Sequence, residues 1–275
     1  MTSIILDDIT LFHDVSGDGE PVVLLHAGIC DHRMWDPQWP TLTEKYRAVR
    51  LDLPGCGQST LPPHAFAYHD IVLRLMDHLA IDRAVLIGAS FGGSVALDVA
   101  LAAPDRVRGL ILAAPAVGGA ITGWEVDAFG DQEDALIDSG DLDAAAQLNV
   151  DFWLVGQHRA AKDVNPALRQ AVFTMQRGSF DVPVPEGCRS IKLDPPATTR
   201  LREIMAPTLV IGGLLDTPSF VDLARRAAHE IPNAQLWERP NTAHLPTYED
   251  PDPATVRILE ALSQFTGTPG PYYSD

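Results

Sequence analysis

The chain has 275 residues, of which 46% are hydrophobic and 21% are charged, the ordinary mixture of a globular protein. This composition excludes a disordered chain, a collagen-like chain and a coiled coil. The formal net charge of −17 disfavours binding to nucleic acid or to an anionic membrane surface, because like charges repel. No apolar run reaches the roughly 18 to 20 residues that a membrane span needs. We therefore expect a cytoplasmic protein without membrane contact.

Short apolar runs bounded by Gly, Pro and Asp predict six strands. Several of these runs, such as VVLL, AVLI and TLVI, are continuously apolar instead of alternating. Such runs are typical of strands in a parallel sheet that is covered on both faces by helices. Two shorter segments, 4–6 and 10–13, flank Asp7-Asp8 and predict a hairpin. The six strands are residues 21–26, 46–52, 84–88, 108–113, 208–212 and 234–238.

Helices are predicted between these strands. Residues 67–79 place Ile71, Leu75 and Leu79 on one face, which makes an apolar stripe. Residues 93–103 are nearly all small and apolar, so we expect a buried helix there. Two more helices, 219–230 and 252–265, each follow a turn that contains proline.

The alternation of strands and helices stops between Pro115 and about Pro207. This stretch is rich in aromatic residues, and its segment from Glu125 to Asp151 holds nine acidic residues and no Lys or Arg. The acidic segment could favour a cationic or neutral substrate, although a solvated helix face is the more ordinary explanation. We interpret the stretch as a mostly helical insertion that packs over the sheet. The predicted division is a core of residues 1–116 and 201–267, an insertion of residues 117–200 and a mobile tail of residues 268–275.

The strongest chemical signal is Gly88-Ala89-Ser90-Phe91-Gly92, between a predicted strand and a predicted helix. A serine on such a tight turn needs small residues two before and two after it, because larger side chains do not fit. The turn exposes the serine hydroxyl at the carboxyl edge of the sheet. In this context we interpret Ser90 as a nucleophile and not merely as part of a small-residue helix start.

Serine is a weak nucleophile unless a base and an orienting acid activate it. Asp216 follows the strand TLVIGG, and His244 follows the strand AQLWE, so both lie at the edge of the sheet where Ser90 lies. The chain order Ser, Asp, His is that of hydrolases with a serine on a strand-to-helix turn. Taken alone, Asp216 could be a helix cap and His244 a surface residue. An oxyanion hole then needs backbone N–H groups, which we expect from Phe91 and from the loop 26–30.

The segments VVLLHAGICDHRMWDPQ, LDLPGCGQS, GASFGG, GGLLDTP and NTAHLP together resemble the α/β-hydrolase fold family, in its esterase, enol-lactonase and cofactor-free haloperoxidase branch. The resemblance covers residues 3–267. It implies a mostly parallel eight-stranded sheet with helices on both faces and a helical cap between strands six and seven. It also implies Ser90 as nucleophile, Asp216 as acid and His244 as base, with the amides of Gly28 and Phe91 as the oxyanion hole. The family's His-Gly-X is replaced here by His26-Ala27-Gly28.

Four aromatic residues could line an apolar substrate pocket, although core packing explains each of them equally well. They are Trp35, Trp124, Phe152 and Trp153. His26 and Asp52 are more easily explained as residues that support their loops. The histidines lack the spacing of a zinc site, the three cysteines lack a CxxC pair, and no phosphate-binding or dinucleotide motif occurs. We therefore expect no metal and no cofactor.

We predict a serine hydrolase that cleaves a carboxylic ester or lactone of a small to medium apolar substrate through an acyl-enzyme. The same residues could instead cleave a carbon–carbon bond next to a ketone, or a methyl ester of a natural product. A ligand-binding receptor with low turnover is a hypothesis of another class. The only partner we expect is a small-molecule substrate, and both a monomer and a homodimer are compatible with the sequence.

Overall fold

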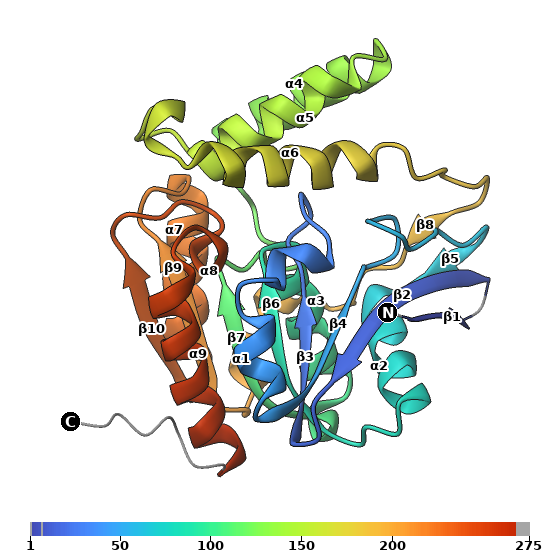
Figure 1. The fold of residues 1–275 in the computed structure, drawn as a ribbon, viewed down its shortest axis with the longest axis vertical. Helices are drawn as coiled ribbons and strands as arrows, with labels where there is room; N and C mark the ends of the chain where they lie inside the picture. The colour runs from blue at the N-terminus through green and yellow to red at the C-terminus, as the bar shows by residue number, and fades with distance from the viewer. Residues whose placement is uncertain (1, 7, 268–275) are drawn as a thin grey trace.

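The computed structural model describes residues 2–6 and 8–267. It contains an eight-stranded sheet in the order β1-β2-β4-β3-β6-β7-β9-β10 (Figure 1). The six strands from β4 to β10 in this order are parallel, and β2 is antiparallel to both of its neighbours. The strands are β1 (Thr2–Leu6), β2 (Ile9–Ser16), β3 (Glu20–Leu25), β4 (Tyr46–Leu51), β6 (Ala84–Ala89), β7 (Val107–Ala113), β9 (Thr208–Gly213) and β10 (Ala234–Arg239). The predicted α/β class with a mostly parallel sheet is confirmed.

The central strands bury both of their faces. In β3, Val22 and Leu24 belong to one apolar core, and Val23 and Leu25 belong to the other. One core is closed by α2 (Tyr68–His78), α3 (Phe91–Ala102) and α7 (Pro218–Glu230), and the opposite core by α1 (Trp39–Thr43) and α9 (Pro251–Thr266). Burial on both sides explains why these strands are apolar at every position.

Three helices lie beyond the carboxyl ends of the strands (Figure 1). They are α4 (Trp124–Asp138), α5 (Leu142–Asn149) and α6 (Pro166–Ser179), and they come between β7 and β9 in the chain. A π-helical turn, η3 (Val150–Val155), follows α5 directly. We call residues 124–179 the α4–α6 layer. Its buried side chains, among them Val150, Leu154 and Val172, join the core on the α1 and α9 side of the sheet.

Several short elements complete the described residues, and the predicted tail 268–275 lies outside them. A parallel pair of two-residue strands, β5 (Ala65–Phe66) and β8 (Arg189–Ser190), was not expected from the sequence. The described helices include none that is both long enough and apolar enough to cross a membrane. The remaining short helices are η1 (His32–Trp35), η2 (Pro104–Arg106), η4 (Ala161–Asp163), η5 (Ala197–Thr199), η6 (Leu201–Glu203) and α8 (Pro246–Glu249).

Candidate active site

Ser90 lies on the turn between β6 and α3. Its backbone has a φ of 48° and a ψ of −113°, a region that residues other than glycine rarely occupy. Two glycines permit the turn. A Cβ on Gly88 would lie 2.4 Å from the Gly92 carbonyl oxygen, and a Cβ on Gly92 would lie 2.3 Å from the Leu25 carbonyl oxygen. The tight turn leaves the Ser90 side chain partly exposed at the carboxyl edge of the sheet.

A continuous chain of hydrogen bonds joins Ser90, His244 and Asp216. The Oγ of Ser90 lies 2.7 Å from Nε2 of His244, and Nδ1 of His244 lies 2.7 Å from Oδ2 of Asp216. The other carboxylate oxygen of Asp216 accepts a hydrogen bond of 2.7 Å from the Thr217 amide. Asp216 and His244 are buried, at 3% and 2% exposed. The structure thus brings together three residues that lie on three separate loops.

The imidazole of His244 is held by aromatic rings and by the backbone. The Trp153 ring lies 4.4 Å from it between centroids, and the Phe220 ring packs edge-on at 4.6 Å. The His244 amide also donates to the Trp153 carbonyl oxygen at 3.3 Å. The π-helical turn η3 therefore contacts both the ring and the backbone of His244.

Glu249 and Arg159 support the loop that carries His244. The Glu249 carboxylate accepts hydrogen bonds of 3.0 Å from the amides of Ala243 and Leu245, which flank the histidine. Burial raises the pKa of Glu249, and the adjacent Arg159 guanidinium opposes that rise. Arg159 pairs with Glu249 and donates as well to the carbonyl oxygens of residues 154, 155 and 241. These bonds link the His244 loop to η3.

Two residues from which we expect backbone N–H groups, Gly28 and Phe91, lie near Ser90. Phe91 follows the serine at the N-terminus of α3, and Gly28 is an exposed residue in the otherwise buried loop 26–30 after β3. A Cβ on Gly28 would lie 3.5 Å from the Cβ of Phe91, so the two residues are in contact distance. His26 holds the base of this loop, because its Nδ1 donates to the Ala27 carbonyl oxygen at 2.8 Å and its Nε2 accepts from the Leu53 amide at 2.9 Å. Burial lowers the pKa of His26, which favours the neutral ring that both bonds require.

A cavity of about 250 Å³ opens onto Ser90 and His244. Its wall on the side of the core includes Gly28 and Ile29. The α4–α6 layer contributes two aromatic and three polar residues to the opposite wall: Phe129, Trp153, Glu133, Asn149 and Gln176. The sequence analysis did not identify the three polar residues, because they come from three different helices and carry no motif.

The four aromatic residues that we expected to contact substrate occupy different environments. Trp153 lines the cavity beside Ser90, and Phe152 stacks on Phe129 behind it with centroids 4.5 Å apart. Trp35 is fully buried in the core, and Trp124 is 80% exposed at the start of α4. Neither Trp35 nor Trp124 lines this cavity.

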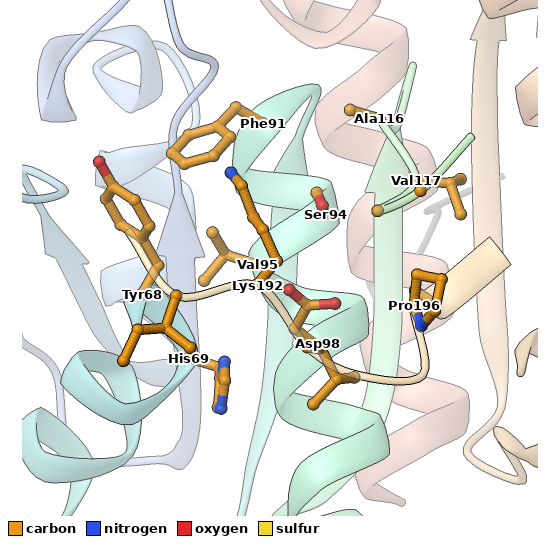
Figure 2. A pocket seen from close by; sticks show the side chains of 15 residues that line it. Tyr68, His69, Phe91, Ser94, Val95, Asp98, Ala116, Val117, Lys192 and Pro196 are labelled. Carbon is orange, nitrogen blue, oxygen red and sulfur yellow. The ribbon is translucent and has the colours of Figure 1, made fainter. Parts of the chain in front are cut away.

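A second cavity, of about 300 Å³, lies between α2, α3 and the segment 191–197 (Figure 2). Phe91, the residue after Ser90, lines this cavity, and its ring packs edge-on against Tyr68. Asp98 lines this cavity, and burial raises the pKa of its carboxyl. This cavity is lined by neither Ser90 nor His244, so the first cavity is the one in which a ligand would contact both residues.

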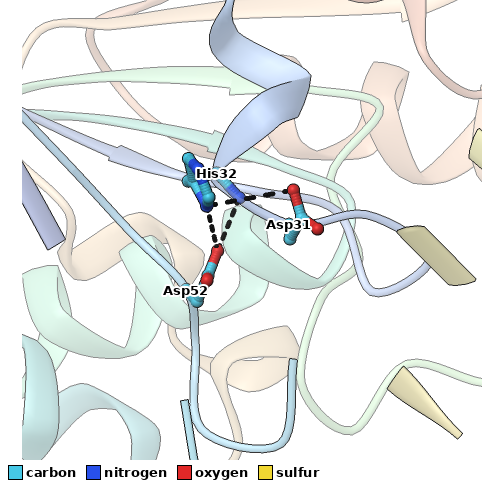
Figure 3. Close-up of side chains that lie close together, drawn as sticks. All are labelled: Asp31, His32 and Asp52. Carbon is cyan, nitrogen blue, oxygen red and sulfur yellow. Dashed lines mark hydrogen bonds and ion pairs between the residues drawn. The ribbon is translucent and has the colours of Figure 1, made fainter. Parts of the chain in front are cut away.

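Asp31 and His32, which follow the loop 26–30, form a buried cluster with Asp52 (Figure 3). Oδ1 of Asp52 accepts from the His32 amide at 2.8 Å and lies 2.7 Å from the His32 Nδ1. Its Oδ2 accepts from the Gln58 amide at 2.8 Å, and Asp31 binds the Arg33 guanidinium. The carboxylates of Asp31 and Asp52 thus accept hydrogen bonds from donors of the protein itself. The bonds of Asp52 hold the loop after β4 against η1.

Comparison with known proteins agrees with this architecture. A model of the Alpha/beta hydrolase family matches residues 22–258, most of the chain. The chain belongs to this family of hydrolases. The resemblance inferred from the motifs is therefore confirmed.

Relatives of the chain include an esterase and a haloperoxidase-like protein. The chain is 27% identical to a pimeloyl-[acyl-carrier protein] methyl ester esterase of Vibrio cholerae, over 91% of this chain and 97% of that one. It is 28% identical to a putative non-heme bromoperoxidase of Mycobacterium tuberculosis, over 92% and 97% of the two chains. A solved thermophilic esterase from Thermogutta terrifontis is 26% identical, with a TM-score of 0.77 and coverage of 94% of both chains.

Proposed function

We propose that this protein is a serine hydrolase that cleaves a carboxylic ester or a lactone through an acyl-enzyme. The observation that carries the proposal is the hydrogen-bond chain from Ser90 through His244 to Asp216, with 2.7 Å at both links. A hydrolase also needs a space in which the substrate reaches the serine, and the cavity that opens onto Ser90 provides this space. The family relationship supports a hydrolase, and the esterases among the relatives support ester chemistry.

The geometry fits the two half-reactions of acyl transfer. In the first, Oγ of Ser90 forms a bond to the carbonyl carbon, and Nε2 of His244 takes the serine proton and passes it to the leaving alkoxide. Asp216 holds the imidazole through Nδ1 and stabilises its positive charge. The amides of Gly28 and Phe91 would donate to the oxyanion. In the second half-reaction His244 deprotonates a water molecule, which attacks the carbonyl carbon of the acyl-enzyme. The bond to Ser90 then breaks, Ser90 regains its proton from His244, and the carboxylic acid leaves.

The test is the hydrolysis of p-nitrophenyl butyrate by the wild type, by Ser90→Ala and by Ser94→Ala. Ser94 is the matched control, because it lies one turn further along α3 and lines the second cavity. We expect Ser90→Ala to lower kcat by roughly three or more orders of magnitude and Ser94→Ala to leave it almost unchanged. Ester hydrolysis that survives in Ser90→Ala contradicts the proposal.

The substrate panel also contains a γ-lactone, a methyl ester and a β-diketone. The methyl ester is included because the Vibrio cholerae relative is a methyl ester esterase by name. Turnover of the ester or lactone that depends on Ser90 supports the proposal. Cleavage of the β-diketone alone would replace it with carbon–carbon bond hydrolysis at the same serine.

A further inference from the structure

Three hydrogen-bonding side chains face Ser90 across the cavity. Glu133 comes from α4, Asn149 from the end of α5 and Gln176 from α6. Asn149 donates both N–H groups of its amide, one to Oε1 of Glu133 at 2.5 Å and one to the Ala145 carbonyl oxygen at 3.0 Å. The Oδ1 of Asn149 therefore remains available to accept a hydrogen bond from a ligand. This wall thus contains one carboxylate, that of Glu133, and two amide side chains whose oxygens are acceptors.

Gln176 is buried, at 6% exposed, and its side-chain oxygen, Oε1, has no hydrogen-bond partner among the described residues. An unpaired buried polar group destabilises the folded state, so such groups normally have a partner. Gln176 lines the cavity, but its Oε1 is covered by protein atoms, so a rotation of the side-chain amide is needed to offer this oxygen to a donor group of a bound molecule.

Glu133 lacks a counterion. Within the described chain it forms no ion pair, although Asn149 donates to it. Burial raises the pKa of Glu133, with the Asn149 hydrogen bond opposing the rise and the charge of the neighbouring Asp134 adding to it. A cation placed beside the carboxylate would relieve this cost, because an opposite charge stabilises the ionised form.

Aromatic rings complete the surroundings of this carboxylate. Phe129 and Trp153 line the same cavity and pack edge-on against each other, with centroids 5.3 Å apart. Aromatic faces attract ammonium groups, and the attraction grows when the cation is desolvated. A carboxylate, amide acceptors and aromatic rings around one space are the set of groups that recognises an organic ammonium ion.

We infer that the α4–α6 wall of the cavity is an ammonium-binding subsite, so that the substrate is an ester or lactone that carries a protonated amine. The inference rests on the proposed function for the reaction at Ser90. The amine is held by Glu133, with hydrogen bonds to Asn149 and Gln176, while the carbonyl group reaches Ser90. The wall excludes anionic substituents, because Glu133 repels them.

Binding of three small aromatic probes tests the subsite without requiring turnover. Benzylammonium, benzyl alcohol and benzoate are each titrated into the wild type by calorimetry at neutral pH. We expect benzylammonium to bind about tenfold or more tightly than benzyl alcohol, and benzoate to bind more weakly than both. Benzylammonium should also inhibit p-nitrophenyl butyrate hydrolysis competitively, because it occupies the space beside Ser90.

Variants of α4 distinguish binding at Glu133 from attraction of the cation by the overall negative charge of the protein. Glu133→Gln keeps an acceptor for Asn149 but removes the charge, and we expect it to remove most of the preference for benzylammonium. Glu133→Lys should reverse the preference in favour of benzoate. The matched control is Asp131→Asn, because Asp131 is an exposed carboxylate on the same helix and does not line the cavity.

Equal affinity for the three probes, no measurable binding of benzylammonium, or a preference that is as large in Glu133→Gln as in the wild type would each overturn the inference. These results are independent of the reaction. Loss of the proposed function would appear instead as ester hydrolysis that is absent, or that is the same in the wild type and in Ser90→Ala.

Discussion

At the scale of single residues, the position of Ser90 depends on two glycines that lack a Cβ. The Cβ of an alanine at position 92 would lie 2.3 Å from the Leu25 carbonyl oxygen, on a strand that cannot move away without disturbing the sheet. We expect Gly92→Ala to displace the turn, to lower the free energy of unfolding by about 1 to 3 kcal/mol and to reduce kcat strongly. Chemical denaturation and p-nitrophenyl butyrate rates measure both effects.

Gly130→Ala is the control for this prediction. Gly130 lies inside α4, and a Cβ built there meets no atom within 4 Å. Alanine is the better helix former, so this variant should be more stable by about 0.5 to 1 kcal/mol with unchanged activity. Equal effects of the two substitutions would show that the close contact at position 92 is unimportant.

His26 makes the stability of the protein sensitive to acid. Burial lowers the pKa of His26 in the folded state, whereas in the unfolded chain the ring takes up a proton below about pH 6.5. The unfolded state therefore binds more protons in this range. The free energy of unfolding should fall as the pH drops below about 6.5, by up to about 1.4 kcal/mol per pH unit for this group.

The His26→Gln variant isolates this contribution. Burial also lowers the pKa of His13, so the wild type and the variant share the acid sensitivity that His13 causes. The difference between their unfolding free energies should shrink between neutral pH and the acidic range, because the variant cannot gain a proton at position 26. Parallel curves for the two proteins would contradict the assignment of a neutral, buried ring.

The sequence was informative about residues that lie at the ends of strands. Ser90 and Asp216 follow the buried strands β6 and β9, and His244 comes after the partly exposed edge strand β10. These strands are parallel, so their carboxyl ends lie at one edge of the sheet. Side chains of the cavity wall could not be predicted in this way. Trp35 turns into the core at the end of η1, and Glu133 and Gln176 face Ser90 only through the packing of separate helices.

At the scale of elements, Arg159 ties the α4–α6 layer to the loop of His244. The side chains of Arg159 and Glu249 are 14% and 4% exposed, so their pair is largely shielded from water. Removing one partner of a buried pair leaves the other charge unpaired and costs about 3 to 5 kcal/mol. We expect Arg159→Met to lower the free energy of unfolding by an amount of this order. It should also lower kcat, because the amides beside His244 depend on Glu249.

Two further variants check the reason for that loss. Arg225→Met removes an exposed arginine that also pairs with a carboxylate, Glu238, and it should have a much smaller effect. Adding Glu249→Gln to Arg159→Met should restore part of the lost stability, since no unpaired charge then remains. A double variant as unstable as the sum of its single variants would contradict the role of the buried pair.

The elements differ in how well the sequence predicted them. Each of the six predicted strands agrees with the structure within about one residue at either end. The four central strands β3, β6, β7 and β9 contain short, continuously apolar runs such as VVLL and TLVI, which are typical of strands covered on both faces. The pair β5 and β8 was missed, because strands of two residues show no periodicity. The π-helical turn η3 was also unpredictable, since its apolar residues continue the pattern of α5.

At the scale of the whole molecule, the charge distribution agrees with the proposed ammonium subsite. The net charge is −17, and α4 and α5 carry much of the acidic segment 125–151 on the layer that closes the cavity. A negative surface around a cavity raises the local concentration of cations and speeds their association. A neutral molecule of the same size does not experience this effect.

Salt should therefore weaken the binding of a cationic ligand and leave a neutral one unaffected. We expect the Kd of benzylammonium to rise several-fold between low salt and about 0.5 M sodium chloride, because mobile ions screen exposed charges beyond a few ångströms. The Kd of benzyl alcohol should stay constant over the same range. Calorimetric titrations at each salt concentration make the comparison. In Glu133→Gln the salt dependence of benzylammonium binding should decrease only partly, since the other acidic residues remain. A benzylammonium Kd of the wild type that does not change with salt would exclude attraction by the net charge of the protein.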